Sequence, residues 1–120
     1  MNASTFQPIL EELHHNSTDV IASTLIAVDG IPLCSILPRN ADADRVGGMS
    51  AAMLSLGQRT TKELLSSQMK QLIVESQDGF ILLVQATDDL VLVTTARKEA
   101  KLGIIMLHVR QAVAQIRQVA

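Results

Sequence analysis

The histidines and the single cysteine are the side chains best suited to chemistry, but their spacing does not favour it. His14 and His15 are adjacent, so on a helix they point about 100° apart and cannot form the i, i+4 pair that holds a zinc ion. Cys34 has neither a basic neighbour nor a CxxC partner to lower its pKa. We therefore predict no catalytic residue, no metal site and no cofactor.

Two further patterns suggest ligands at first sight. The segment Val46-Gly-Gly-Met-Ser50 is rich in glycine, but it lacks the GxxxxGK[ST] spacing and the lysine of a phosphate-binding loop. The acidic pairs at 42 and 44 and at 88–89 are too few for a calcium loop, which needs several more spaced oxygen ligands. We interpret them as caps and turn residues.

Composition narrows the class of protein. The 120 residues are 48% hydrophobic and carry a formal net charge of -2, so we expect one domain over 1–120 and no nucleic-acid partner. No apolar run approaches the ~20 residues of a membrane span, which argues against membrane insertion. The N-terminal stretch does not resemble a secretory signal, and a lone cysteine fits a reducing compartment, so we expect a cytoplasmic protein.

The periodicity predicts an α+β domain with the order αββαβββα. After a short amphipathic helix, two β-rich runs, Val20–Val28 and Ile31–Leu37, are joined by Asp29-Gly30, a dipeptide suited to a tight turn. A long helix follows, and then come three further runs: "SQMKQLIVES", "FILLVQA" and "LVLVTTA". The last two are nearly continuous aliphatic, as in central strands covered on both faces. From about Lys98, apolar residues at spacings of three and four predict a final helix.

The middle helix, 45–65, is unusual because glycine, alanine and serine make up much of it. Its larger apolar residues form one stripe, which we expect to pack on the sheet: Val46, Met49, Met53, Leu56, Thr60 and Leu64. The adjacent stripe is mostly small, so another backbone can approach it closely, as in a two-fold homodimer. The alternative is that the small stripe packs under this chain's own terminal helix. The third strand, as a sheet edge, would also offer unpaired backbone groups to a symmetry mate. The predicted dimer interface is Gly47, Ser50, Ala51, Leu54, Gly57, Met69, Gln71 and Ile73.

The ordered set of motifs resembles a known family. It comprises Val28-Asp29-Gly30 and "PLCS" in the first hairpin, "SLGQRTTKELL", "QLIVESQDGFILLV", "DDLVLVTTA" and "AKLGIIMLHVRQAV". Together, from about Val20 to Ile116, these are similar to the roadblock family of dynein light chain-related domains, in particular its stand-alone prokaryotic members. The chain departs from the family pattern twice: "LLSSQMKQ" lacks the glycine often found before the third strand, and Lys101-Leu102-Gly103 replaces an Asn-Leu-Gly element.

The resemblance implies a five-stranded antiparallel sheet, with the middle helix on one face and the terminal helices on the other. It also implies a homodimer through the middle helix and third strand, and a Ras-like small GTPase as partner, bound on the paired middle helices. On this chain the docking surface would comprise Arg45, Gly48, Ala52, Ser55, Arg59 and Lys62.

The sequence is compatible with several roles. Arg39, Arg45, Arg59 and Arg97 are each able in principle to act as an arginine finger on a bound GTPase, and the sequence does not choose among them. A second hypothesis is an assembly adaptor that dimerises with other roadblock-type subunits, or binds peptides, without affecting GTP turnover. A third, a small-ligand sensor, is disfavoured because aromatic and convergent polar residues are lacking. We do not expect an enzyme.

Overall fold

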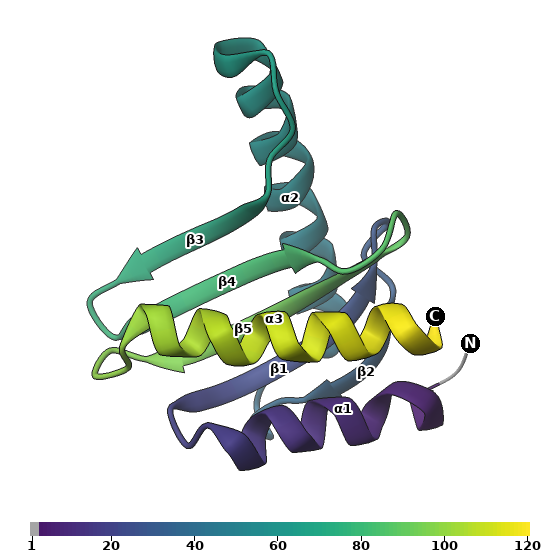
Figure 1. The fold of residues 1–120 in the computed structure, drawn as a ribbon, viewed down its shortest axis with the longest axis vertical. Coiled ribbons are helices and arrows are strands. Elements are labelled where there is room, and N and C mark those ends of the chain that lie inside the picture. The colour runs from purple at the N-terminus through teal and green to yellow at the C-terminus, as the bar shows by residue number, and fades with distance from the viewer. Residues whose placement is uncertain (1–2) are drawn as a thin grey trace.

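The computed structural model describes residues 3–120 as three helices around one five-stranded antiparallel sheet (Figure 1). The strand order is β2-β1-β5-β4-β3, so the β1–β2 hairpin and the three-stranded meander β3–β4–β5 meet where β1 pairs with β5. The predicted order αββαβββα is confirmed. The elements are α1 (Ala3–Asn16), β1 (Val20–Ala27), β2 (Pro32–Ile36), α2 (Ala43–Leu65), β3 (Gln71–Ser76), β4 (Gly79–Gln85), β5 (Leu90–Arg97) and α3 (Leu102–Val119).

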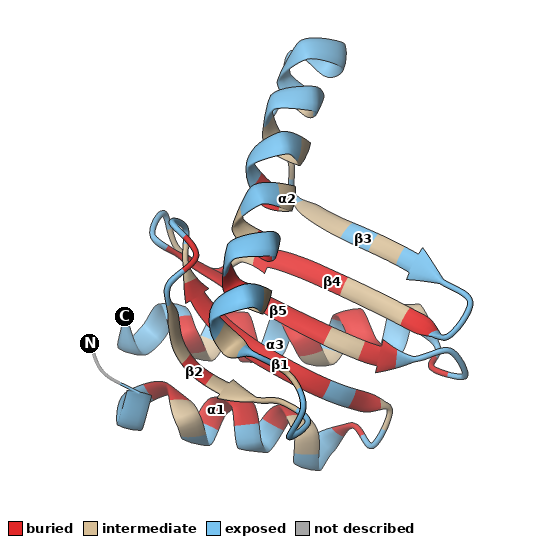
Figure 2. Cartoon of the chain, turned by 180° about the vertical axis from the view of Figure 1, so that it is seen from behind, coloured by how far each residue is buried: buried red, intermediate tan, exposed pale blue. Residues whose placement is uncertain are grey.

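The helices cover the two faces of the sheet unequally, in the arrangement that the family resemblance implied. α1 and α3 lie side by side on one face, and α2 crosses the other (Figures 1 and 2). The larger core lies under α1 and α3 and includes Phe6, Leu10, Leu92 and Ile116. A smaller core lies under α2 and consists of Ile26, Leu54, Leu83, Val91 and Val93.

The position of each strand follows from its residue pattern. β5 is central, and its residues from Leu90 to Thr94 are all buried, because both of its faces are covered. β3 is an edge strand, as predicted, and none of its residues is fully buried. A strand exposed in this way presents a row of unpaired backbone groups.

The turn between β1 and β2 needs its glycine. Gly30 has φ +99°, a left-handed conformation that L side chains rarely adopt, and its N–H donates to the carbonyl of Ala27 at 2.8 Å. The carboxylate of Asp29 accepts the N–H of Ile31 at 3.3 Å. The predicted Asp29-Gly30 turn is therefore confirmed, with each residue in a definite role.

α2 is capped at both ends by polar residues. Asp42 is its N-cap, and its carboxylate accepts the N–H of Asp44 at 3.0 Å and that of Arg45 at 3.4 Å. At the other end, Ser66 adopts the left-handed conformation (φ 52°, ψ 38°), and its N–H donates to the carbonyl of Lys62. Glycine is the usual residue at such a position. The serine is how this chain closes α2 without the glycine often found before the third strand.

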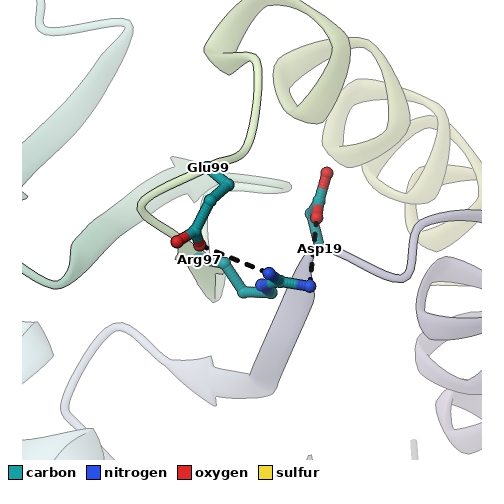
Figure 3. Close-up of polar contacts among 3 residues, drawn as sticks. All are labelled: Asp19, Arg97 and Glu99. Atoms are coloured by element: carbon teal, nitrogen blue, oxygen red, sulfur yellow. Dashed lines mark ion pairs between the residues drawn. The ribbon is translucent and has the colours of Figure 1, made fainter.

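The final helix begins later than the sequence predicted. It starts at Leu102, because residues 98–100 form a turn in which the N–H of Ala100 donates to the carbonyl of Arg97 at 3.0 Å. The guanidinium of Arg97 lies 3.8 Å from a carboxylate oxygen of Asp19 and 3.4 Å from one of Glu99 (Figure 3). These ion pairs are half-exposed and contribute little to stability. They do, however, engage Arg97 within its own chain.

Candidate functional site

The small stripe of α2 faces this chain's own sheet, which corrects the predicted orientation of the helix. Gly47, Ser50 and Leu54 are the buried residues of α2. A Cβ on Gly47 would come within 3.0 Å of the carbonyl oxygen of Gly30, closer than real Cβ atoms essentially ever come. Glycine at 47 therefore lets the helix backbone lie against the β1–β2 turn.

Two more residues of the predicted interface pack inward. A Cβ on Gly57 would lie 2.7 Å from Sδ of Met69, and Ala51 packs against the core beneath α2. Gly47, Ser50 and Leu54 are therefore buried within this chain, and Ala51, Gly57 and Met69 already have contacts within it. Their assignment to a partner interface stays a prediction, and this intrachain packing argues against it. The physical reason is that small residues permit close approach without specifying whose backbone approaches. The alternative, a contact of the small stripe with the terminal helix, is wrong, because α3 lies on the opposite face of the sheet (Figure 1).

Larger apolar residues of α2 point to solvent instead. Met49 is 55% exposed and Leu56 is 63% exposed, and at the end of the helix Leu64 and Leu65 are 75% and 71% exposed. We call these four residues the exposed apolar set. The C-terminal half of α2 extends past the edge strand β3, so no strand of this sheet lies beneath its last turns (Figures 1 and 2). An apolar helix surface of this kind marks an interaction site.

The six residues of the docking surface implied by the resemblance form one exposed line along α2, which we call the docking line. They recur at alternating spacings of three and four, and every one of them is exposed: Arg45, Gly48, Ala52, Ser55, Arg59 and Lys62. Three carry a positive charge and the other three are small, so the cations are separated by residues that leave the helix backbone accessible. It runs beside the exposed apolar set on the same helix.

At the edge strand, the predicted residues Gln71 and Ile73 are accessible. Ile73 is 36% exposed, and Gln71 accepts a hydrogen bond from Arg110 of α3 at 3.0 Å. An open groove of about 1200 Å³ borders this end of β3, between the end of α2 and α3, and its lining includes Lys62, Lys70 and Arg117. Sequence reasoning missed this groove, because its cations come from segments far apart along the chain.

On the face of the sheet covered by α1 and α3, the titratable side chains of His14 and Cys34 are engaged in packing. Nε2 of His14 lies 2.8 Å from Oγ of the buried Ser23, and burial lowers the pKa of this histidine below its ordinary value. Burial raises the pKa of the Cys34 thiol to about 11, which leaves it protonated at neutral pH. Within residues 3–120, no three His, Cys, Asp or Glu side chains are grouped to hold a metal ion, and no helix is long and apolar enough to span a bilayer.

These features together describe a protein-interaction domain, with an exposed helix face and an open sheet edge. Residues 9–96 match the model of the Roadblock/LC7 domain, and the chain belongs to this family. The matched range begins before the segment that carries the sequence resemblance and ends before α3. An uncharacterised protein of Methanocaldococcus jannaschii, MJ0714, is 34% identical over 118 residues, which cover 98% of each chain.

Solved structures share the fold at lower identity. The Roadblock/LC7 domain from Streptomyces avermitilis superposes with a TM-score of 0.85 at 17% identity, covering 92% of both chains. MglB of Myxococcus xanthus gives a TM-score of 0.89 at 14% identity, covering 98% of this chain and 88% of its own. The gliding protein MglB from Thermus thermophilus gives 0.84 at 19% identity, covering 98% and 89%. At such identities the likeness concerns the fold.

Proposed function

We propose that the protein is a cytoplasmic, homodimeric regulator or scaffold of a Ras-like small GTPase. The observation that carries the proposal is the outer face of α2, where a line of accessible cations runs beside an apolar surface on a Roadblock/LC7 fold. The protein contributes binding and orientation, and the GTPase contributes the chemistry.

A second copy of this chain suits the uncovered surfaces of the first. When a symmetry mate adds its β3 to the free edge, the combined sheet continues beneath the projecting half of α2. Leu64 and Leu65 then pack on the neighbouring sheet, while Met49 and Leu56 pack near the paired helix. The proposed interface therefore keeps Gln71 and Ile73 and replaces the buried small residues of α2 with the exposed apolar set.

Pairing of α2 with the partner's α2 would place two copies of the docking line on one surface. Two copies of Arg45, Arg59 and Lys62 on one platform would attract an acidic surface of the GTPase and orient it. Arg97 is a poor arginine finger, because Asp19 and Glu99 already hold its guanidinium. We propose that any effect on GTP hydrolysis acts through the GTPase's own switch residues and needs no catalytic side chain here.

The test is capture of a GTPase by the intact protein from native lysate, with either GDP or a non-hydrolysable GTP analogue. We expect a small GTPase to be retained, and Arg59→Glu on the docking line to abolish its retention. Arg39→Glu is the matched control, since Arg39 is also exposed but lies before α2. Equal capture by both variants at unchanged dimer mass would refute docking on α2.

An assembly adaptor is the second candidate, and a different surface favours it. Ile104 and Leu107 are large apolar residues exposed on α3, on the face of the sheet away from α2. In addition, an MglB structure described as having a tetrameric arrangement shares this fold, with a TM-score of 0.84 at 18% identity over 97% of this chain and 90% of its own. Recovery of another roadblock-type subunit, with GTP turnover unchanged, would favour the adaptor.

A further inference from the structure

The free edge strand β3 presents different side chains to the two faces of the sheet. Ile73 is opposite Leu82, which belongs to the core under α1 and α3, so Gln71, Ile73 and Glu75 lie on that side. Leu72 is opposite Leu83, which belongs to the core under α2, so Leu72 and Val74 lie on the other side. A partner strand must therefore match two different patterns at once.

Two opposite charges on the first of these sides have no counter-ion within residues 3–120. Arg110 of α3 lies over the beginning of β3, where its Nη2 donates to Oε1 of Gln71 at 3.0 Å. Glu75 is four residues further along β3 on the same side. Both side chains are exposed, and neither forms an ion pair with another residue in the part of the chain that the structure describes. Within one chain the strand separates them.

Two-fold symmetry restricts how two copies of β3 can pair. In a continuous antiparallel sheet, opposed residues share a face. The two-fold axis therefore lies midway between two copies of one residue, which are opposite each other. With the axis at Val74, Ile73 is opposite the partner's Glu75, which places an apolar side chain against a charge. With the axis at Leu72, Lys70 is opposite the partner's Val74, with the same defect.

The axis at Ile73 avoids both defects. Ile73 is then opposite the partner's Ile73, and Leu72 is opposite the partner's Val74, so apolar residues meet on both faces. Gln71 is opposite the partner's Glu75, with Cβ atoms about 5 Å apart. Since the guanidinium of Arg110 already contacts Gln71, the partner's carboxylate comes within its reach.

We propose, on the basis of the homodimer argued above, that β3 pairs about Ile73 and that Arg110 of each protomer forms an ion pair with the partner's Glu75. The two equivalent pairs lie at the ends of the strand junction. Because these ion pairs are partly exposed, they add little affinity. Their main effect is to select this register and to disfavour partner subunits without matching charges.

Cysteine cross-linking tests the register directly. The variants Leu72→Cys, Ile73→Cys and Val74→Cys are prepared in a Cys34→Ala background, oxidised, and separated on non-reducing gels. Only a residue on the axis is opposite its own copy at the Cα separation of about 5.5 Å that a disulfide needs. We expect Ile73→Cys to cross-link. Cross-linking of Val74→Cys or Leu72→Cys instead, or of none of the three, would overturn the proposed register.

A charge exchange tests the ion pair. We expect Glu75→Arg and Arg110→Glu each to weaken dimerisation about tenfold or more, and the double variant to recover most of the loss. Lys70→Glu with Asp78→Lys is the matched control, since only the register about Val74 would couple this pair. Additive effects of Glu75→Arg and Arg110→Glu would contradict the ion pair.

Light scattering on the unchanged protein tests the proposed homodimer separately from the proposed pairing of β3. A monomer would refute the proposed homodimer and the pairing with it. A dimer that cross-links at another position would refute only the pairing and leave the proposed function standing.

Discussion

Replacing Gly47 by alanine tests the close approach of α2 to the β1–β2 turn. The added Cβ would meet the backbone carbonyl of Gly30, which cannot rotate away as a flexible side chain could. To restore van der Waals contact, the helix or the turn must retreat by roughly 1 Å. Leu54 lies on the same helix and packs on the strand residues of the smaller core, so such a retreat also loosens that core.

The magnitude follows from two opposing effects. Overpacking of a fixed contact costs up to about 3 kcal/mol, and exchange of glycine for alanine inside a helix returns about 1 kcal/mol. We therefore expect Gly47→Ala to lower the free energy of unfolding by about 2 kcal/mol. Gly48→Ala is the matched control, since a Cβ there meets nothing within 4 Å, and it should raise the free energy of unfolding by up to about 1 kcal/mol.

The assay is urea unfolding followed by far-ultraviolet circular dichroism, because the chain has no tryptophan or tyrosine. Both variants are compared at one protein concentration, since dimerisation makes stability depend on concentration. Equal stability of Gly47→Ala and Gly48→Ala would refute the rigid contact. If Gly47→Ala instead kept its stability but lost its dimer mass, the predicted placement of Gly47 in a partner interface would be supported.

Three other residues give further predictions. Ser66→Gly should raise the free energy of unfolding by about 0.5–1 kcal/mol, measured in the same urea experiment, because glycine adopts the left-handed conformation at this C-cap without a Cβ penalty. Since the unfolded state takes up a proton near the ordinary histidine pKa of 6.5 and folded His14 resists it, stability should fall as the pH drops below 6.5 through the lowered folded pKa. Thermal melts across this range should show a smaller decline for His14→Gln. The thiol of Cys34 should react with iodoacetamide far more slowly in the folded than in the urea-unfolded protein, and equal rates would contradict its burial and raised pKa.

Much of the fold could be predicted because it depends on local patterns. Alternating and continuous apolar runs located the strands, and Asp29-Gly30 located the first turn. The orientation of α2 was not accessible in this way. Both stripes of the helix are apolar enough to be buried, and they differ mainly in the size of their side chains. The choice depends on the distance between Gly47 and Gly30, which is a property of tertiary packing.

The exposure of the candidate docking residues could be predicted for the same reason, whereas their docking role stays a prediction. The docking line at Arg45, Arg59 and Lys62 lies on the polar side of α2, and a helical repeat suffices to place it on the exposed surface. The contact between Arg110 and Gln71 joins two elements that are distant in sequence, and no local pattern indicates it. The start of α3 was missed because the turn at 98–100 contains no proline or glycine.

The pairing of β1 with β5 has a consequence for how the chain folds. Each outer hairpin forms from neighbouring residues, whereas this central pairing brings Val20 beside Ala96, near the other end of the chain. Closing so long a loop is entropically costly before any contact compensates for it, so such topologies fold slowly. Because α2 covalently connects the β1–β2 hairpin to the β3–β4–β5 meander, its docking on the sheet shortens that search. The helix that presents the outer surface is thus also the element best placed to set the folding rate.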